Sequence, residues 1–174
     1  CPPSSGYLVY QRGSMRLAFS YMVLAVLGLV HSSWPAEKVT LRDLPLLGKS
    51  ARPLTGYAGK PHVLVFWAVW CGPCAAELRE LERVSRSEKT PFIGIAVDSV
   101  EKQAARMVER TGVTFANYLD NDSAFADALG VSGVPSLLVI DSKGNVVWSQ
   151  SGYSVFPEQA LKEQIKKVSN NKKE

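Results

Sequence analysis

Residues 63–74 read VLVFWAVWCGPC, and this stretch decides the fold. The run from Val63 to Trp67 is apolar throughout, which is typical of a strand buried on both faces. From Pro73 to about Ser87 the apolar side chains recur with helical spacing, so a helix follows the strand almost at once. A proline is well placed in the first turn of that helix, where no N–H is needed. The two cysteines therefore lie where a buried strand passes into a helix.

The segments after this junction alternate between apolar runs and helical patterns. We expect three further strands and three further helices, with the last strand folding back as a hairpin. The strands are 92–97, 115–119 and 136–140 with its return at 146–148, and the helices are 100–111, 123–129 and one that begins at Pro157. Asp98 or Ser99 is the expected cap of the helix 100–111, and Asp122 that of the helix 123–129. This order is typical of an α/β protein with a mixed central sheet and helices on both sides. Residues 39–47 predict an N-terminal extension with a short strand or hairpin.

The composition fits one ordinary globular domain. The chain has 174 residues, of which 46% are hydrophobic and 21% charged, with a formal charge of +4. Its 20 basic residues are mixed with 16 acidic ones, so we expect no binding of nucleic acid. Three cysteines are too few for a disulfide scaffold, and the odd number leaves at least one unpaired.

An apolar segment near the start of the sequence stands apart from this domain. Residues 17–30, LAFSYMVLAVLGLV, follow two arginines and precede a short polar stretch, which is the layout of a secretory signal. Fourteen helical residues reach only about 21 Å, short of the roughly 30 Å hydrocarbon core of a membrane. We therefore expect a signal peptide that is cleaved near Ser32. The alternative is an uncleaved signal anchor, and only in that case do we expect the protein to contact a membrane.

These patterns divide the chain into four parts. Residues 1–14 are an upstream segment that carries Cys1, and residues 15–32 are the signal peptide or anchor. The globular domain spans 37–169, and 170–174 form a polar tail. The signal predicts that the domain works outside the cytoplasm, in the periplasm or at the outer face of a bacterial cytoplasmic membrane. That domain keeps only the two cysteines of the strand–helix junction.

The spacing of Cys71 and Cys74 predicts a redox pair. Two residues between cysteines at the start of a helix let both sulfurs come within disulfide distance. Cys71 stands at the helix N-terminus, where the dipole and the free backbone N–H groups favour a thiolate. We expect its pKa to fall from about 8.5 into the range of roughly 3.5 to 7.5 that such motifs span. Cys71 is then the attacking thiol and Cys74 the resolving one.

Other uses of the two cysteines fit the sequence less well. A structural zinc site would need two more soft ligands, whereas the domain offers only His62, which we expect at the surface. A purely structural disulfide in so small a loop would constrain the unfolded chain little. A copper-binding module, in which Cys71 and Cys74 are soft ligands, lacks a third ligand near them. We expect no metal and no cofactor.

Three segments together resemble a known family. They are FWAVWCGPC at 66–74, GVSGVPSLLVID at 130–141 and KGNVV at 143–147. The chain resembles the thioredoxin superfamily from about residue 39 to 168, and within it the extracytoplasmic TlpA/ResA-type thiol-disulfide oxidoreductases, which have a Redoxin-type domain. The resemblance implies a thioredoxin fold with a strand–helix insertion around residues 113–130.

The resemblance also assigns residues that contact the substrate. Pro135 matches the cis-proline of the family, which faces the active-site disulfide and leaves the backbone of Val134 free to pair with a substrate strand. Trp70, Gly72 and Pro73, which surround the cysteines, complete the substrate-binding residues of this reading. The dipeptide Gly72-Pro73 is that of thioredoxin itself. Val134 differs both from the threonine that is common there in the TlpA/ResA branch and from the isoleucine of thioredoxins. The direction of electron flow therefore stays open.

Glu77 is the third candidate catalytic residue. It follows Cys74 by three positions and matches a glutamate that the TlpA/ResA branch uses near its active site. There it could relay a proton to Cys74 during disulfide breakage. Val65 stands where cytosolic thioredoxins have a buried aspartate, which favours Glu77 or water for this task. The residues alone equally allow a solvated carboxylate paired with nearby arginines.

The resemblance implies a monomeric disulfide reductase for exported proteins. Its partners would be disulfide-bearing envelope proteins, apocytochrome c among them, and a membrane thiol-electron transporter that reduces it again. The alternative is an oxidant or isomerase of the same fold. A reduction potential near −120 mV would indicate an oxidant, and one of about −270 mV a reductant. A peroxiredoxin is disfavoured because Ala68 stands where that class needs threonine or serine.

Overall fold

The computed structural model describes residues 38–48, 52–152 and 158–170. The expected upstream segment, signal, Pro157 and most of the polar tail lie outside these residues. Among the residues described, no helix has the length and apolar character that a membrane span requires.

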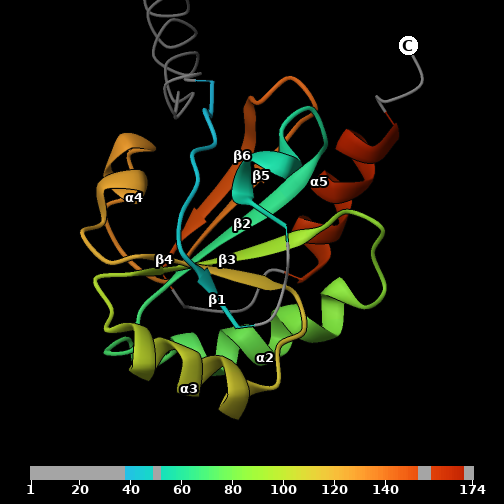
Figure 1. Cartoon of the computed structure of the whole chain (residues 1–174). Coiled ribbons are helices and arrows are strands. Elements are labelled where there is room, and N and C mark those ends of the chain that lie inside the picture. Colours follow the sequence, from blue (N-terminus) through green and yellow to red (C-terminus); the bar gives the residue numbers. More distant parts are fainter. Residues whose placement is uncertain (1–37, 49–51, 153–157, 171–174) are drawn as a thin grey trace, which may run out of the picture. The chain divides into compact units, whose positions relative to one another are not determined.

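Within these ranges, six strands form one mixed sheet in the order β1-β4-β3-β2-β5-β6 (Figure 1). The strands are β1 Leu46–Leu47, β2 His62–Trp67, β3 Phe92–Val97, β4 Ala116–Asp120, β5 Ser136–Ile140 and β6 Val146–Ser151. The strands β2, β3 and β4 are parallel, while β1, β5 and β6 are each antiparallel to a neighbour. The predicted mixed sheet and hairpin are confirmed. Within residues 39–47, where a short strand or hairpin was expected, the two-residue strand β1 forms.

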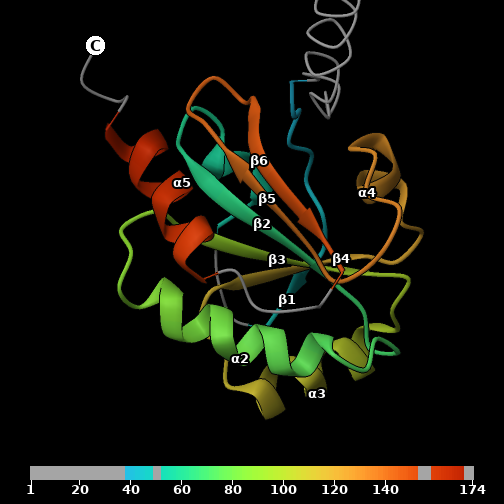
Figure 2. The same cartoon turned by 180° about the vertical axis from the view of Figure 1, so that it is seen from behind.

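Four α-helices and one short 3₁₀ helix are described with the sheet. They are η1 Leu54–Tyr57, α2 Cys74–Ser85, α3 Glu101–Thr111, α4 Ala124–Ala128 and α5 Glu158–Asn170. In Figures 1 and 2, α2 and α3 lie side by side along one side of the sheet, and α4 lies on the other. This arrangement confirms the expected thioredoxin-type layers and the strand–helix insertion, to which β4 and α4 belong.

The core forms where the apolar runs predicted it. Every residue of β2, β3 and β5 is buried, as expected of strands covered on both faces. Trp67 is buried and its Nε1 donates a hydrogen bond of 3.0 Å to Asn117 Oδ1. A Cβ atom at Gly94 would stand 1.8 Å from that oxygen, so only glycine leaves room for the pair.

Two expectations for individual residues are wrong. His62 is buried rather than exposed, because it is the first residue of β2 and pairs with Ile140 of β5. Its Nδ1 bonds the Lys60 carbonyl at 2.8 Å, and burial lowers its pKa. Neither Asp98 nor Ser99 caps α3, whose cap residue has an extended backbone and no side-chain bond.

Candidate active site

The register of the sheet brings the candidate residues to one edge. The parallel strands β2 and β3 end together there, with Trp67 opposite Ala96. The next strand, β5, runs antiparallel and begins at Ser136 opposite Phe66. The cysteine loop after β2 and the Val134–Pro135 segment before β5 therefore meet at the same edge.

Cys71 and Cys74 form a disulfide in the structure. Cys74 opens α2 and is completely buried, whereas Cys71 keeps 6% of its surface exposed. The residues between them, Gly72 and Pro73, are exposed. No described side chain caps the N-terminus of α2, so among the described residues no side-chain acceptor competes there for the first amide groups. The pair is thus asymmetric, and Cys71 is the sulfur that another molecule can reach.

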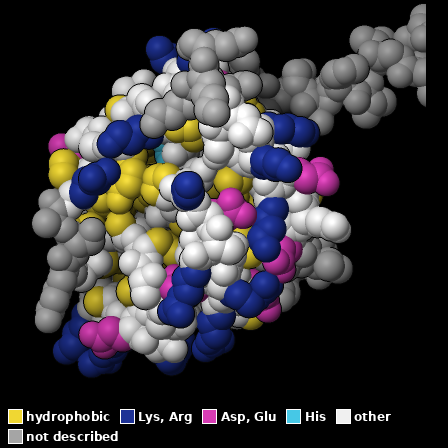
Figure 3. Space-filling view, turned by 90° about the vertical axis from the view of Figure 1, so that its right-hand side faces the viewer, with side chains coloured by type: hydrophobic (Ala, Val, Ile, Leu, Met, Phe, Trp, Pro, Cys, Tyr) yellow, Lys and Arg dark blue, Asp and Glu magenta, His cyan; other side chains and the backbone are white. Residues whose placement is uncertain are grey.

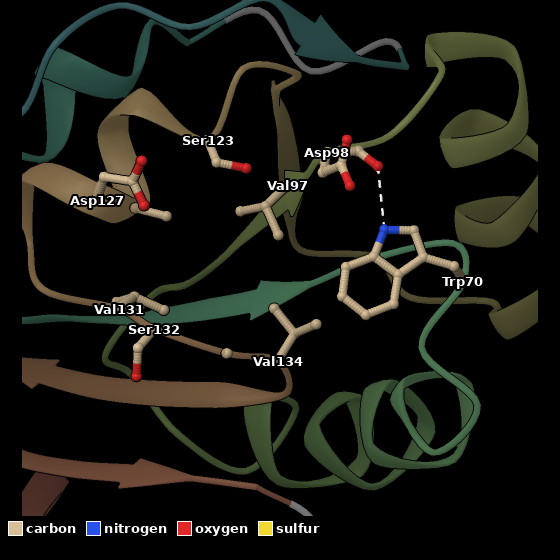
Figure 4. Close-up of a pocket in the computed structure, with 10 residues that line it drawn as sticks. Trp70, Val97, Asp98, Ser123, Asp127, Val131, Ser132 and Val134 are labelled. Carbon is tan, nitrogen blue, oxygen red and sulfur yellow. Dashed lines mark hydrogen bonds between the residues drawn. The ribbon is translucent and has the colours of Figure 1, made fainter.

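Trp70 flanks the reactive sulfur on the outside. Its side chain is 61% exposed, and Nε1 donates a hydrogen bond of 3.2 Å to the Asp98 carbonyl (Figure 4). This bond ties the cysteine loop to the end of β3. Ser99 adds a second tie, because its Oγ accepts a bond from the Val69 amide and donates one to the Val97 carbonyl.

The segment before β5 has the backbone geometry that the resemblance implied. The Val134–Pro135 peptide bond is cis, with Pro135 buried and Val134 half-buried. Ser136 Oγ donates a 2.7 Å bond to the Gly133 carbonyl, which fixes the loop ahead of the strand. Among the residues described, the N–H and carbonyl of Val134 make no backbone hydrogen bond, so both can serve an incoming strand.

Glu77 lies one turn beyond Cys74 on the inward face of α2. Only 2% of its surface is exposed, and burial raises its pKa to about 7. It has neither an ion pair nor a side-chain hydrogen bond with any other described residue. Arg83 of this helix pairs with Glu158, and Arg86 just after the helix pairs with Glu82, while Arg79 forms no ion pair with a described residue. A solvated carboxylate held by arginines is therefore not what the structure shows.

A pocket of about 220 Å³ adjoins these residues (Figure 4). Trp70 and the end of β3 form one wall, and α4 with the loop 131–134 forms the other. Sequence reasoning did not predict this pocket, because its walls come from three segments that only the sheet register brings together. Two of its residues are acidic, Asp98 and Asp127.

The wall made by α4 is fixed by a residue that the sequence reading passed over. Asp122, the expected cap, accepts only the Ala124 amide, at 3.2 Å. The buried Asp120 accepts the amides of Phe125 and Ala126 at 2.9 to 3.1 Å, and Arg42 donates to it at 3.3 Å. An aspartate that ends a strand just before a helix was the available signal.

Comparison with known proteins adds the decisive observation. A model of the Redoxin family matches residues 32–165. The chain belongs to the Redoxin family. This Redoxin is 30% identical over 148 residues to the thiol-disulfide oxidoreductase ResA of Geobacillus thermodenitrificans, covering 78% of the chain and 85% of the relative. It is 28% identical over 119 residues to the thiol:disulfide interchange protein DsbE of Escherichia coli K12, covering 68% of the chain and 64% of the relative.

Solved structures agree on the fold. A secreted Mycobacterium tuberculosis disulfide oxidoreductase, described as homologous to DsbE, superposes with a TM-score of 0.65 at 22% identity. The match covers 73% of this Redoxin and 96% of that chain. StoA of Bacillus subtilis gives a TM-score of 0.61 at 17% identity, covering 75% and 98%. The family, the curated relatives and the Cys71–Cys74 pair make this Redoxin a ResA-like thiol-disulfide oxidoreductase of the thioredoxin superfamily.

Proposed function

We propose that the protein reduces disulfides of exported proteins outside the cytoplasm, using Cys71 and Cys74 as one redox couple. The observation that carries the proposal is the unequal access to the two sulfurs. Cys71 keeps 6% of its surface exposed and lies just before the start of α2, while Cys74, the first residue of the helix, is completely buried. An incoming disulfide can meet Cys71 alone, and Cys74 can meet only Cys71.

The reaction follows from this asymmetry. The Cys71 thiolate attacks one sulfur of the substrate disulfide, and the other substrate sulfur leaves as a thiolate. The Cys74 thiolate then attacks the Cys71 sulfur and releases the first substrate sulfur. Two electrons have passed to the substrate, and the enzyme holds the Cys71–Cys74 disulfide seen in the structure. A thiol donor must reduce this disulfide before the next cycle.

The exposed groups around Cys71 suit a polypeptide substrate. The free N–H and carbonyl of Val134 can extend the sheet edge with one residue of a bound strand. Trp70, Gly72 and Pro73 offer an open surface beside the attacking sulfur. In this proposal Pro135 has the role that the resemblance implies, facing the disulfide directly after Val134.

Glu77 is proposed as the group that handles the proton of Cys74. The Cys74 thiol has to lose its proton before it can attack, and it is buried. Glu77 lies one helical turn away on the same face, with a pKa of about 7. A carboxyl that is half ionised near neutral pH can accept this proton and return it.

The location and the partners belong to the same proposal. The signal-like layout of residues 15–32 and the secreted relative of known structure support work outside the cytoplasm. Disulfide-bearing envelope proteins are the proposed substrates, with apocytochrome c as one of them, and a membrane thiol-electron transporter is the proposed reductant. We propose that the protein acts as a monomer.

Trapping of the mixed disulfide tests this function. A Cys74→Ala variant, produced as the full chain in a bacterial envelope, is expected to hold exported proteins on Cys71 through bonds that dithiothreitol cleaves. The matched control, Cys71→Ala with Cys74→Ala, is expected to hold none. The proposal fails if Cys74→Ala captures nothing and no thiol donor reduces the disulfide of the wild-type protein.

A further inference from the structure

The pocket beside Trp70, the residue that precedes Cys71, has an apolar interior. Val97, Ala126, Val131 and Val134 contribute aliphatic side chains, and the indole of Trp70 closes one side (Figure 4). Its volume of about 220 Å³ suits one side chain of leucine or phenylalanine size. Val134 itself lines the pocket, so a strand paired with its backbone would lie beside the opening.

The rim of the pocket carries charge of one sign. Among the described residues, the charged side chains that line it are those of Asp98 and Asp127. Both aspartates are exposed, and neither has an ion pair with another described residue. The chain as a whole is basic, with a formal charge of +4, and lysine and arginine side chains are spread over the face shown in Figure 3. The acidic rim is therefore a local feature and not a property of the general surface.

The backbone also singles out this pocket. Asp98 and Ser123 have φ angles of 41° and 57°, and they are the non-glycine residues with positive φ in the described part of the chain. Both line the pocket. A residue with a side chain adopts a positive φ angle at a cost in conformational free energy. Residues strained in this way cluster at binding and active sites.

We propose that this pocket determines which disulfides the enzyme reduces. It takes an apolar side chain of the substrate segment that pairs with Val134, and Asp98 and Asp127 favour a lysine or arginine beside that side chain. The inference rests on the proposed function, because it needs a polypeptide disulfide at Cys71. The substrate class is thus an extended segment with an apolar and a basic residue close to the target cysteine.

Three synthetic peptides test the charge preference. Each has one cysteine held as a mixed disulfide with 2-mercaptoethanol, a leucine near it, and Lys, Gln or Glu beside the leucine. Enzyme reduced with dithiothreitol and then freed of it supplies two electrons, and the products are the peptide thiol, 2-mercaptoethanol and the enzyme disulfide. The second-order rate constant of this single turnover is measured at low and at high ionic strength.

For the wild type we expect the Lys peptide to react about 2- to 5-fold faster than the Glu peptide at low salt, as for exposed charge pairs. In the double variant Asp98→Asn, Asp127→Asn this ratio should fall to about 1, and high salt should reduce it in the wild type. Asparagine tolerates the positive φ of Asp98, so the backbone is preserved. The control Glu109→Gln, an exposed acid near the far end of α3, should keep the wild-type ratio.

The possible failures are distinct. If the wild type reduces the three peptides equally fast, or if the Asn variants keep the wild-type ratio, the pocket does not select by charge and the inference is wrong. A peptide with serine in place of leucine that reacts as fast as its leucine partner would remove the apolar half of the inference. If the reduced enzyme reacts with none of the peptides, the proposed function fails as well.

Discussion

Glu77 and Glu82 lie five positions apart on the same helix, and both are buried, yet their carboxyl groups are in opposite situations. Burial alone would raise the pKa of Glu82, but hydrogen bonds from the amide and hydroxyl of Thr114 and from Arg86, all at 2.8 Å, lower it. Glu77 has no such donors among the described residues, and burial raises its pKa to about 7. One carboxyl is a fixed structural anion, and the other can exchange a proton near neutral pH.

The difference shows what a partner does for a buried charge. Hydrogen bonds to the charged form of a carboxyl offset the cost of its burial. Glu82 uses them to hold the loop after α3 against α2. Glu77 remains uncompensated beside Cys74, and a group held in this way is the more reactive of the two. The predictions below separate the two roles.

The largest effect should be a gain of stability when the uncompensated carboxyl is removed. Because the folded state raises the pKa of Glu77 from 4.5 to about 7, its folded form binds the proton more tightly. The stability that protonated Glu77 contributes is present in full below about pH 4.5 and is lost as the pH rises through 7, where the buried carboxyl becomes charged. Glu77→Gln should therefore match the wild type at pH 4 and exceed it by about 3 kcal/mol at pH 8.

Denaturant unfolding across this pH range provides the measurement. Glu80→Gln, at a half-buried position on the same helix where the carboxylate has Arg83 as its partner, is the matched control and should show no such pH-dependent gain. A constant difference between Glu77→Gln and the wild type at every pH would contradict the raised pKa.

Removal of the partnered carboxyl should have the opposite sign. Glu82→Ala leaves the Thr114 amide and hydroxyl without their acceptor, and we expect a loss of about 2 kcal/mol at pH 7. Since the folded state lowers the pKa of Glu82, this loss should shrink as acid protonates the carboxyl in the wild type. Unfolding curves at pH 7 and pH 4 measure it, and a stabilised variant would rule out the anchor role.

The catalytic difference between the two carboxyls should be smaller in energy. Glu77→Gln should slow the reduction of insulin disulfides about 10-fold, less than the roughly 10²- to 10⁴-fold that a fully engaged general base contributes. The wild-type rate should also show a titration near pH 7 that the variant lacks, since the group that takes the Cys74 proton is gone. Glu82→Gln, compared at equal folded fraction, should keep both rate and profile. An unchanged pH profile in Glu77→Gln would assign the proton to another group.

The smallest effect concerns one hydrogen bond of the anchor. Thr114→Val removes the hydroxyl that donates to Glu82 but keeps the backbone amide bond. We expect a loss of about 1 kcal/mol in the free energy of unfolding. Chemical denaturation checks it, and a loss as large as that of Glu82→Ala would mean that the hydroxyl, not the amide, dominates the anchor.

Local patterns predicted the parts of the site that depend on neighbours in sequence. The buried run of β2, the start of α2 and the Cys71–Cys74 pair all follow from residue spacing within twelve positions. The cis bond before Pro135 came from the resemblance. The catalytic and substrate-binding roles of these residues remain predictions.

What the sequence could not provide depends on packing. The burial of Glu77 and the partners of Glu82 are set by what covers α2, which no spacing along the helix reveals. His62 looked like a surface residue because strand β2 starts one position earlier than its apolar run. Asp98 and Asp127 belong to segments 29 positions apart, and only the sheet and α4 bring them to one pocket.

The reduction potential of the Cys71–Cys74 couple tests the central claim most directly. It is measured at pH 7 by equilibrium with dithiothreitol or glutathione buffers, with Cys74→Ala as the control that has no couple. A reductase of exported proteins predicts a potential near the thioredoxin end of the scale, about −270 mV. A potential near −120 mV would contradict the account and identify the protein as a disulfide oxidant.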